Sequence, residues 1–322
     1  MDALQTRLAA QGGVASVRDL GTIGVTPQHV QTWVRDSRLV RIRRDAVVEA
    51  DLWNAAPPWE RQALRARAVM LSLLATSAGR SREADGPARQ SHLALSHHSS
   101  LSLQGIPVFG VDDLVHMVRT DGRRGRSGSG LRVHANVDPA YLATVEGLTM
   151  VIAPLACLQV ADTFGVEAGL VSADALLREE PTPADLTRAL AVGRFGRGGS
   201  AARTVAELAD ARMESAGESR TRWVMRVCGL PEPEPQVVVR DAGQFLARVD
   251  FLFAAERTIV EFDGMLKYQS PEDLRAEKYR EDRLRQMGYE VVRLTWADLA
   301  NPARVNRLIL DAFARAARSR AS

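Results

Sequence analysis

Cysteine and lysine are scarce in this chain of 322 residues. Its only cysteines, Cys157 and Cys228, stand far apart and show no metal-binding spacing. Neither a disulfide framework nor a zinc site built from cysteines is therefore expected. Its only lysines, Lys267 and Lys278, fall within one short segment, and the other basic residues are arginines. Because that segment also carries a group of acidic residues, it is the most informative part of the chain.

A long hydrophobic run is also missing. A membrane-spanning helix needs about 18 consecutive apolar residues, whereas the longest run here, residues 150–156, is interrupted by Pro154. The N-terminus lacks the apolar core of a signal peptide. We therefore expect a cytoplasmic protein with no membrane partner.

The overall composition is that of a globular protein. Hydrophobic residues make up 46% and charged residues 25%, which excludes a chain that is disordered throughout, a collagen or a coiled-coil rod. The length suggests two or three domains. The net charge is only +3, so a nucleic-acid-binding surface would have to be a local patch.

The first 52 residues have the pattern of a small DNA-binding module. The expected elements are helices over residues 2–10, 16–20 and 28–37 and strands over 39–42 and 46–48. Thr26 is suited to cap the third helix, and Pro27 to occupy its first position. Three helices followed by a hairpin are the layout of a winged helix-turn-helix. A small helical module with an ordinary solvated face is the alternative.

Two groups of side chains would contact DNA in that arrangement. Those expected to face outward on the third helix are Gln28, Gln31, Thr32 and Arg35. Those of the hairpin are Arg41, Arg43 and Arg44. Gln and Arg can form paired hydrogen bonds with base edges in the major groove, and the hairpin arginines would contact backbone phosphates.

Residues 53–200 indicate an α/β middle domain without internal repeats. This region contains five of the six histidines, namely His92, His97, His98, His116 and His134. They show no metal-binding spacing, and we interpret them as surface or capping residues rather than catalytic groups. The glycine-rich run at 193–200 predicts a hinge or linker, and a helix is expected over 201–216.

Two stretches of the N-terminal half resemble a known family. The run GGVASVRDLGTIGVTPQHVQTWVRDSRLVRIRRDAVV resembles the N-terminal winged helix of AbiEi-type antitoxins, the DNA-binding members of type IV toxin–antitoxin systems. LSHHSSLSLQGIPV, VHANVD and GLTMVIAPLACLQVAD resemble the domain that follows it there. The resemblance spans about residues 3–190. It implies DNA binding more firmly than toxin neutralisation, and it implies a nucleotidyltransferase toxin as a further partner.

Acidic residues are concentrated in the segment RVDFLFAAERTIVEFDGMLKY, residues 248–268. Its alternation predicts two strands joined by a turn at 254–257. Glu261 and Asp263 then fall on one face of the second strand, because side chains alternate along a strand. A solvated hairpin with acids on its wet face is the alternative.

The pairing of these strands decides which carboxylates meet. If Phe253 pairs with Thr258, Asp250 lies opposite Glu261; with a tighter turn it lies opposite Asp263. Either register gathers three carboxylates, since opposed Cβ atoms are about 5 Å apart. Mg²⁺ or Mn²⁺ would offset their repulsion, and such a site can activate water for phosphodiester hydrolysis.

The order of elements from residue 205 to 318 is helix, three-strand meander, helix, strand, helix. This region resembles the very-short-patch-repair-like endonuclease domain, which has the restriction-endonuclease-like α/β fold of PD-(D/E)XK nucleases. The motifs that carry the resemblance are Glu218-Ser219-Arg220, Arg248-Val249-Asp250, Glu261-Phe262-Asp263-Gly264, Lys278-Tyr279-Arg280-Glu281-Asp282 and Val292-Arg293-Leu294-Thr295-Trp296.

The resemblance implies roles for particular residues. Asp250 and Glu261, together with Asp263, would hold the metal, and Glu218 would be a further acidic ligand or would position water. Asp263 stands where the family usually has a lysine, and Lys267 or Lys278 could project into that space. Lys278 and Arg280 would contact DNA. An ion pair of Arg280 with Glu277 or Glu281 along the helix is the alternative.

These observations lead to one main function and one alternative. We expect a DNA-binding protein with a magnesium-dependent endonuclease domain that hydrolyses phosphodiester bonds. The alternative is a non-catalytic transcriptional regulator or antitoxin whose nuclease fold is degenerate. The sequence leaves the oligomeric state open, with a homodimer as one arrangement.

Overall fold

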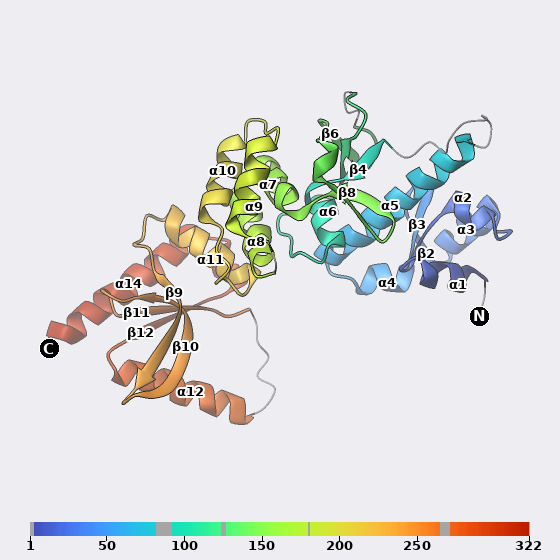
Figure 1. The fold of residues 1–322 in the computed structure, drawn as a ribbon. Coiled ribbons are helices and arrows are strands. Elements are labelled where there is room, and N and C mark those ends of the chain that lie inside the picture. The colour runs from blue at the N-terminus through green and yellow to red at the C-terminus, as the bar shows by residue number, and fades with distance from the viewer. Residues whose placement is uncertain (1–2, 82–91, 124–126, 180, 265–270, 322) are drawn as a thin grey trace. The chain divides into compact units, whose positions relative to one another are not determined.

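The computed structural model describes residues 3–81, 92–123, 127–179, 181–264 and 271–321 (Figure 1). Contacts divide the chain into two compact units, Met1–Ala209 and Asp210–Ser322. About half of the chain is helical and three β-sheets are present, so the protein belongs to the mixed α+β class. None of the described helices combines the length and the apolar character needed to cross a membrane.

The first unit begins with a three-stranded antiparallel sheet and three short helices. Its elements are α1 (Ala3–Ala10), β1 (Val14–Ser16), α2 (Val17–Gly21), α3 (Pro27–Arg35), β2 (Leu39–Arg43) and β3 (Ala46–Glu49). The strand order is β1-β3-β2. The expected three helices and hairpin are confirmed, and so is the Thr26 cap, whose hydroxyl accepts a hydrogen bond from the amide of His29 at 3.2 Å. The sequence did not indicate β1, because all three of its residues are buried and show no alternation.

A five-stranded sheet forms the middle of this unit. Its elements are α4 (Ala50–Ala55), α5 (Pro58–Ser81), β4 (Leu93–Leu95), α6 (His97–Leu103), β5 (Val115–Arg119), β6 (Leu131–His134), the 3₁₀ turn η1 (Pro139–Tyr141), β7 (Leu142–Val145) and β8 (Leu148–Val151). The strand order is β6-β5-β4-β8-β7. Val14 and Val48 of the first sheet share one hydrophobic core with Ala66 and Val69 of α5 and Met117 of β5. The two sheets of this unit are therefore joined by the helix α5 that lies between them (Figure 1).

Four helices complete the first unit and pack against one another (Figure 1). They are α7 (Ala153–Phe164), α8 (Val166–Leu177), α9 (Pro183–Val192) and α10 (Gly199–Leu208). The helix expected over 201–216 therefore ends at Leu208. The glycine-rich run at 193–200 lies close against α7: the amide of Gly196 donates to Asp162 at 3.0 Å, and a Cβ on Gly198 would lie 2.0 Å from the Asp162 carbonyl oxygen. The run thus belongs to the first unit and is not a hinge between the two units.

The second unit has the predicted order of elements, with one short helix added. The elements are α11 (Ala216–Val227), β9 (Glu234–Asp241), β10 (Gln244–Phe253), β11 (Thr258–Phe262), α12 (Pro271–Gln286), β12 (Glu290–Leu294), α13 (Trp296–Leu299) and α14 (Pro302–Ala321). The strand order is β12-β11-β10-β9. Strands β11 and β12 are parallel, and the other pairs are antiparallel.

The helices of the second unit cover both faces of its sheet. On one face, Phe251, Val260 and Val292 pack with residues of α11 and α14 such as Met225 and Ile309. On the opposite face, the neighbouring positions Leu252, Ile259 and Val291 pack with Leu284 of α12. Side chains alternate along a strand, and helices cover both faces of this sheet. The strands must therefore present apolar residues on both faces. The unit is therefore a three-layer helix–sheet–helix arrangement.

Candidate functional site

The acidic side chains of β10 and β11 meet in the first of the two expected registers. Phe253 pairs with Thr258 and Phe251 with Val260, so Asp250 lies opposite Glu261. The backbone N–H of Phe262 donates to Oδ2 of Asp250 at 2.8 Å. This hydrogen bond fixes the Asp250 carboxylate at the end of β11.

Glu218 approaches this pair from the first turn of α11. Ser215 caps that helix, and its hydroxyl donates to Oε1 of Glu218 at 2.8 Å. Oε2 of Glu218 accepts from the amide of Glu214 at 2.9 Å and from Nε2 of Gln236 at 2.8 Å. Only 7% of Glu218 is exposed. Three donors therefore hold a buried carboxylate at the helix start, where the helix dipole also favours negative charge.

The electrostatic environment of Asp250 favours its protonated form. Burial raises the pKa of Asp250 to about 6, and the charges of Glu218, Glu261 and Glu214 act in the same direction. The hydrogen bond from Phe262 opposes this shift. A group of carboxylates that raises the pKa of one member is a site where a cation would be stabilised.

The other residues predicted for this site differ in whether they pair with neighbouring side chains, lie exposed or fall outside the described residues. Glu261 forms ion pairs with Arg280 of α12 at 3.5 Å and with Arg293 of β12 at 3.6 Å. The side chain of Glu277, one of the two alternative partners of Arg280, lies outside the described part of the structure. Asp263 follows the end of β11, where its amide donates to the carbonyl of Leu294. Lys278 is exposed on α12, and Lys267 lies outside the described residues.

The five motifs of this region come together in three dimensions. The Arg220 guanidinium stacks over the ring of Trp296 at 5.6 Å, and Phe262 contacts the same ring edge-on at 4.6 Å. Arg293 also pairs with Glu281 at 3.0 Å. Arg220 and Trp296, which are 76 positions apart in sequence, therefore lie in contact beside Phe262, the neighbour of Glu261.

The first unit brings three of the seven N-terminal residues predicted to bind DNA into one groove of about 660 Å³. It is lined by Gln31 of α3 and by Arg41 and Arg44 of the β2–β3 hairpin. Arg18 of α2, which was not among the predicted residues, lines it as well and is exposed. Nη1 of Arg41 donates to the carbonyl of Arg44 at 2.6 Å, which orders the hairpin turn.

The other predicted contacts fall into two groups. Gln28, Thr32 and Arg35 are exposed on α3, as is Gln31 of the groove. Arg43 is partly buried, and its side chain lies beside Gly130 of the middle sheet. The hairpin arginines thus differ in their freedom to reach a phosphate.

The interpretation of the histidines as surface or capping residues is wrong for most of them. His97, His98 and His116 are buried, and His134 is half-buried. One ring nitrogen from each of His97, His116 and His134 lies within 4.8 Å of the other two. Among the described residues, no other group of three potential metal ligands has its ligand atoms this close together. The carboxylates around Asp250 do not form such a group.

Sequence reasoning missed this cluster because its members are separated along the chain. His97 begins α6, His116 lies within β5, and His134 ends β6. The pairing of β5 with β6 and the position of α6 at the end of β4 bring them together. The available signal was the concentration of five histidines within residues 92–134.

No family model matches the chain. Two curated proteins of Mycobacterium tuberculosis are similar to it, named uncharacterized protein MT2308 (strain CDC 1551 / Oshkosh) and uncharacterized protein Rv2248 (strain H37Rv). Each is 32% identical over 186 residues, which cover 58% of this chain and 68% of the relative. The chain belongs to the same family as these two proteins. Their names state no activity, so the function rests on the sites described above.

Proposed function

We propose that this protein binds DNA through its N-terminal module and hydrolyses phosphodiester bonds with a divalent cation held by the second unit. The observation that carries the proposal is the opposition of Asp250 and Glu261 on neighbouring strands, with the buried Glu218 beside them. Like charges so close destabilise a sheet unless something compensates them. A bound divalent cation would offset this repulsion and could also take part in phosphodiester hydrolysis.

The donor set fits a hard cation such as Mg²⁺ or Mn²⁺. Carboxylate oxygens are its usual protein ligands, with water completing the coordination. Asp250 and Glu261 would hold the ion, and Glu218 would hold a water or contribute a further oxygen. When bound, the ion would polarise the scissile phosphate and lower the pKa of water. Asp263 stands close along the chain and would add negative charge to the site.

Basic residues around this pair would bind the substrate. Arg280 and Arg293 contact Glu261 at 3.5 and 3.6 Å, which is long for a hydrogen-bonded ion pair. Arg293 also pairs with Glu281 at 3.0 Å, so both guanidinium groups would contribute positive charge beside a bound phosphate from the positions that they already occupy. The exposed Lys278 would add a further phosphate contact from α12.

The N-terminal module supports delivery to DNA. The order α1-β1-α2-α3-β2-β3 fits the winged helix-turn-helix proposed for this module, and α3 carries the exposed Gln28, Thr32 and Arg35. The groove between α3 and the hairpin is lined by three arginines and Gln31. Phosphate contacts from the arginines would give salt-dependent affinity, and the helix would read base edges.

The test compares Asp250→Asn and Glu261→Gln with Asp311→Asn, which changes an exposed aspartate of α14. Labelled duplex and single-stranded DNA are incubated with each protein in Mg²⁺ and in Mn²⁺. We expect the first two variants to lose cleavage and the control to keep it. Binding of duplex DNA, measured by fluorescence anisotropy in EDTA, should be the same for all four proteins. If both site variants cut DNA as fast as the unmodified protein, the assignment of the site is wrong.

One observation favours a second candidate function. Glu261 is paired with two arginines, and an aspartate stands at the position where related nucleases usually have a lysine. A non-catalytic regulator or antitoxin with a degenerate nuclease fold would account for both. In that case all four proteins would bind DNA without cleaving it. The nucleotidyltransferase toxin partner and the homodimer stay predictions.

A further inference from the structure

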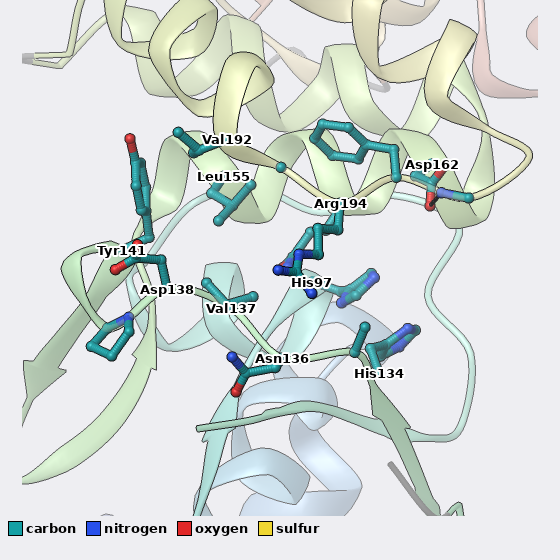
Figure 2. A pocket seen from close by; sticks show the side chains of 16 residues that line it. His97, His134, Asn136, Val137, Asp138, Tyr141, Leu155, Asp162, Val192 and Arg194 are labelled. Carbon is teal, nitrogen blue, oxygen red and sulfur yellow. Dashed lines mark hydrogen bonds between the residues drawn. The ribbon is translucent and has the colours of Figure 1, made fainter. Parts of the chain in front are cut away.

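The three clustered imidazoles occupy one end of the middle sheet. Nδ1 of His116 lies 2.9 Å from Nε2 of His134. The ring of His97 stacks on that of His134, with centroids 3.9 Å apart, and lies 5.1 Å from that of His116. Figure 2 shows His97 and His134 side by side at the wall of a cleft.

We propose that His97, His116 and His134 bind one divalent transition-metal ion, of the zinc class, with one coordination position open to this cleft. A tetrahedral ion with metal–nitrogen bonds of about 2.0–2.1 Å needs its ligand atoms about 3.3 Å apart. The observed separations, from 2.9 Å to at most 4.8 Å, bracket that value. Imidazole nitrogens suit zinc, copper, iron and nickel rather than magnesium or calcium. The ion would therefore differ from the one proposed for the carboxylates of the second unit.

The backbone presents His97 in an unusual way. Its φ angle is +51°, in the left-handed region that residues with a Cβ seldom adopt. Such strain is usually found where a side chain must point in a required direction. Here it occurs at the first residue of α6 and turns the His97 ring toward the end of β6.

Asp112 orients His116 from outside the cluster. Its two carboxylate oxygens lie 3.1 and 3.2 Å from Nε2 of His116. This contact favours a proton on Nε2 and leaves the lone pair of Nδ1 directed at His134. Histidines that bind metals usually donate their second nitrogen to a carboxylate or carbonyl in this way. Nδ1 of His97 has a similar neighbour, the hydroxyl of Ser96 at 2.9 Å.

Burial is the main cause that lowers the pKa of each imidazole, to about 4 for His134 and well below the ordinary value for His97. Burial also lowers the pKa of His116; the charge of Asp112 opposes this shift, and the charge of Arg132 adds to it. These shifts favour the neutral form of each ring.

The cleft beside the cluster has a volume of about 680 Å³ and is lined by both polar and apolar side chains. Figure 2 shows Arg194 reaching toward His97 from the loop after α9. Gln159 and Asp162 line the same cleft, and Oε1 of Gln159 and Oδ1 of Asp162 are buried without a hydrogen-bond partner among the described residues. A water or small anion at the open position would lie within this cleft, with Arg194 available to offset a negative charge.

The experiment measures Zn²⁺ and Co²⁺ binding to the full chain. Asp250→Asn and Glu261→Gln are combined in the background protein, so that the carboxylates of the second unit do not contribute. We expect one equivalent of Zn²⁺ by calorimetry and the intense visible absorption of four-coordinate Co²⁺. Azide should change the Co²⁺ spectrum if the open position faces the cleft; an unchanged spectrum would contradict an open site.

Variants identify the ligands. His116→Gln and His134→Gln should each weaken Zn²⁺ binding by about 100-fold or more, since each removes one of three ligands. The matched control is His29→Gln, which changes an exposed histidine at the start of α3. If buried His116→Gln fails to fold by circular dichroism, the half-buried His134→Gln decides. Absence of binding by the folded background protein, or equal binding by His134→Gln, would overturn the proposal.

Discussion

Gly217 lies so close to Phe262 that a Cβ on the glycine would be 1.9 Å from Cε1 of the phenylalanine ring. The absence of a side chain at this position allows the start of α11 to rest on the end of β11. Glu218 follows directly, so the same contact sets how near that carboxylate comes to Asp250 and Glu261. A packing detail thus determines the geometry of the acidic site.

Gly217→Ala should destabilise the second unit. The added methyl group overlaps the ring of Phe262, and insertions of this kind into packed regions cost about 1–3 kcal/mol. Urea unfolding of the full chain, followed by tryptophan fluorescence, measures the change. Gly21→Ala is the control, because that glycine is also helical and a Cβ there meets nothing within 4 Å. Phe262→Leu in the Gly217→Ala background should recover part of the loss; no recovery would mean that the clash is not the cause.

Asp250→Asn should change how stability depends on pH. The pKa of Asp250 is raised to about 6 in the folded protein, so the folded state binds a proton more tightly than the unfolded state. The free energy of unfolding of the unmodified protein therefore falls as pH rises from about 4 to about 6. A shift of two pKa units corresponds to about 3 kcal/mol, and partial solvent screening lowers this to about 1–2 kcal/mol.

The asparagine variant should lack this fall and be more stable than the unmodified protein at pH 8, but not at pH 4. Urea unfolding in EDTA at these two pH values provides the measurement. Asp311→Asn, on the exposed face of α14, should follow the unmodified protein at both. If Asp250→Asn and the unmodified protein were equally stable at pH 8, burial of the charged Asp250 would not lower the free energy of unfolding.

Arginines of the N-terminal groove should contribute salt-dependent DNA affinity. Each phosphate contact contributes about 0.9 to the slope of log K against log salt. Arg18→Ala, Arg41→Ala and Arg44→Ala should each reduce that slope by about one, whereas Arg203→Ala on α10 should leave it unchanged. Arg43→Ala should have a smaller effect, because that side chain is partly buried beside Gly130. Slopes that do not move in any groove variant would rule out the groove as the phosphate-binding surface.

Asp112→Asn should weaken metal binding at the histidine cluster without removing a ligand. Loss of a carboxylate that orients a metal-binding histidine costs about 10- to 100-fold in affinity. Asp113→Asn is a matched control on the next residue: its carboxylate pairs with Arg65 at 2.7 Å and is 96% exposed. Calorimetry with Zn²⁺ compares the two. Identical affinities would mean that Asp112 has no positioning role.

Local patterns determined much of the second unit. The alternation of apolar and acidic residues in 248–263 predicted both strands, and the requirement that Phe251 and Val260 share a buried face restricted their register. The order of helices and strands followed from turn and capping residues. Such patterns could not predict which side chains approach the carboxylates. The pairing of Arg280 and Arg293 with Glu261 depends on how α12 and β12 pack against β11.

In the first unit, the capped helix α3 and the β2–β3 hairpin could be predicted because their signals lie within a few residues of each other. The three-residue strand β1 could not, because it is defined by its pairing with β3 rather than by its own pattern. The same limit explains why Arg18 was not predicted to bind DNA, since its place in the groove depends on the packing of α2 beside the hairpin.

The sequence alone thus determined the class of most elements and limited the residue opposite Asp250 to Glu261 or Asp263, because both follow from periodicity and from contacts between neighbouring strands; the structure selected Glu261. Only the tertiary structure decided that His97, His116 and His134 meet. Their ring nitrogens are brought within 4.8 Å by a helix start, a strand interior and a strand end. Contacts between residues 18 to 37 positions apart leave no periodic trace, since they depend on the order of strands in the sheet and not on the residues between them.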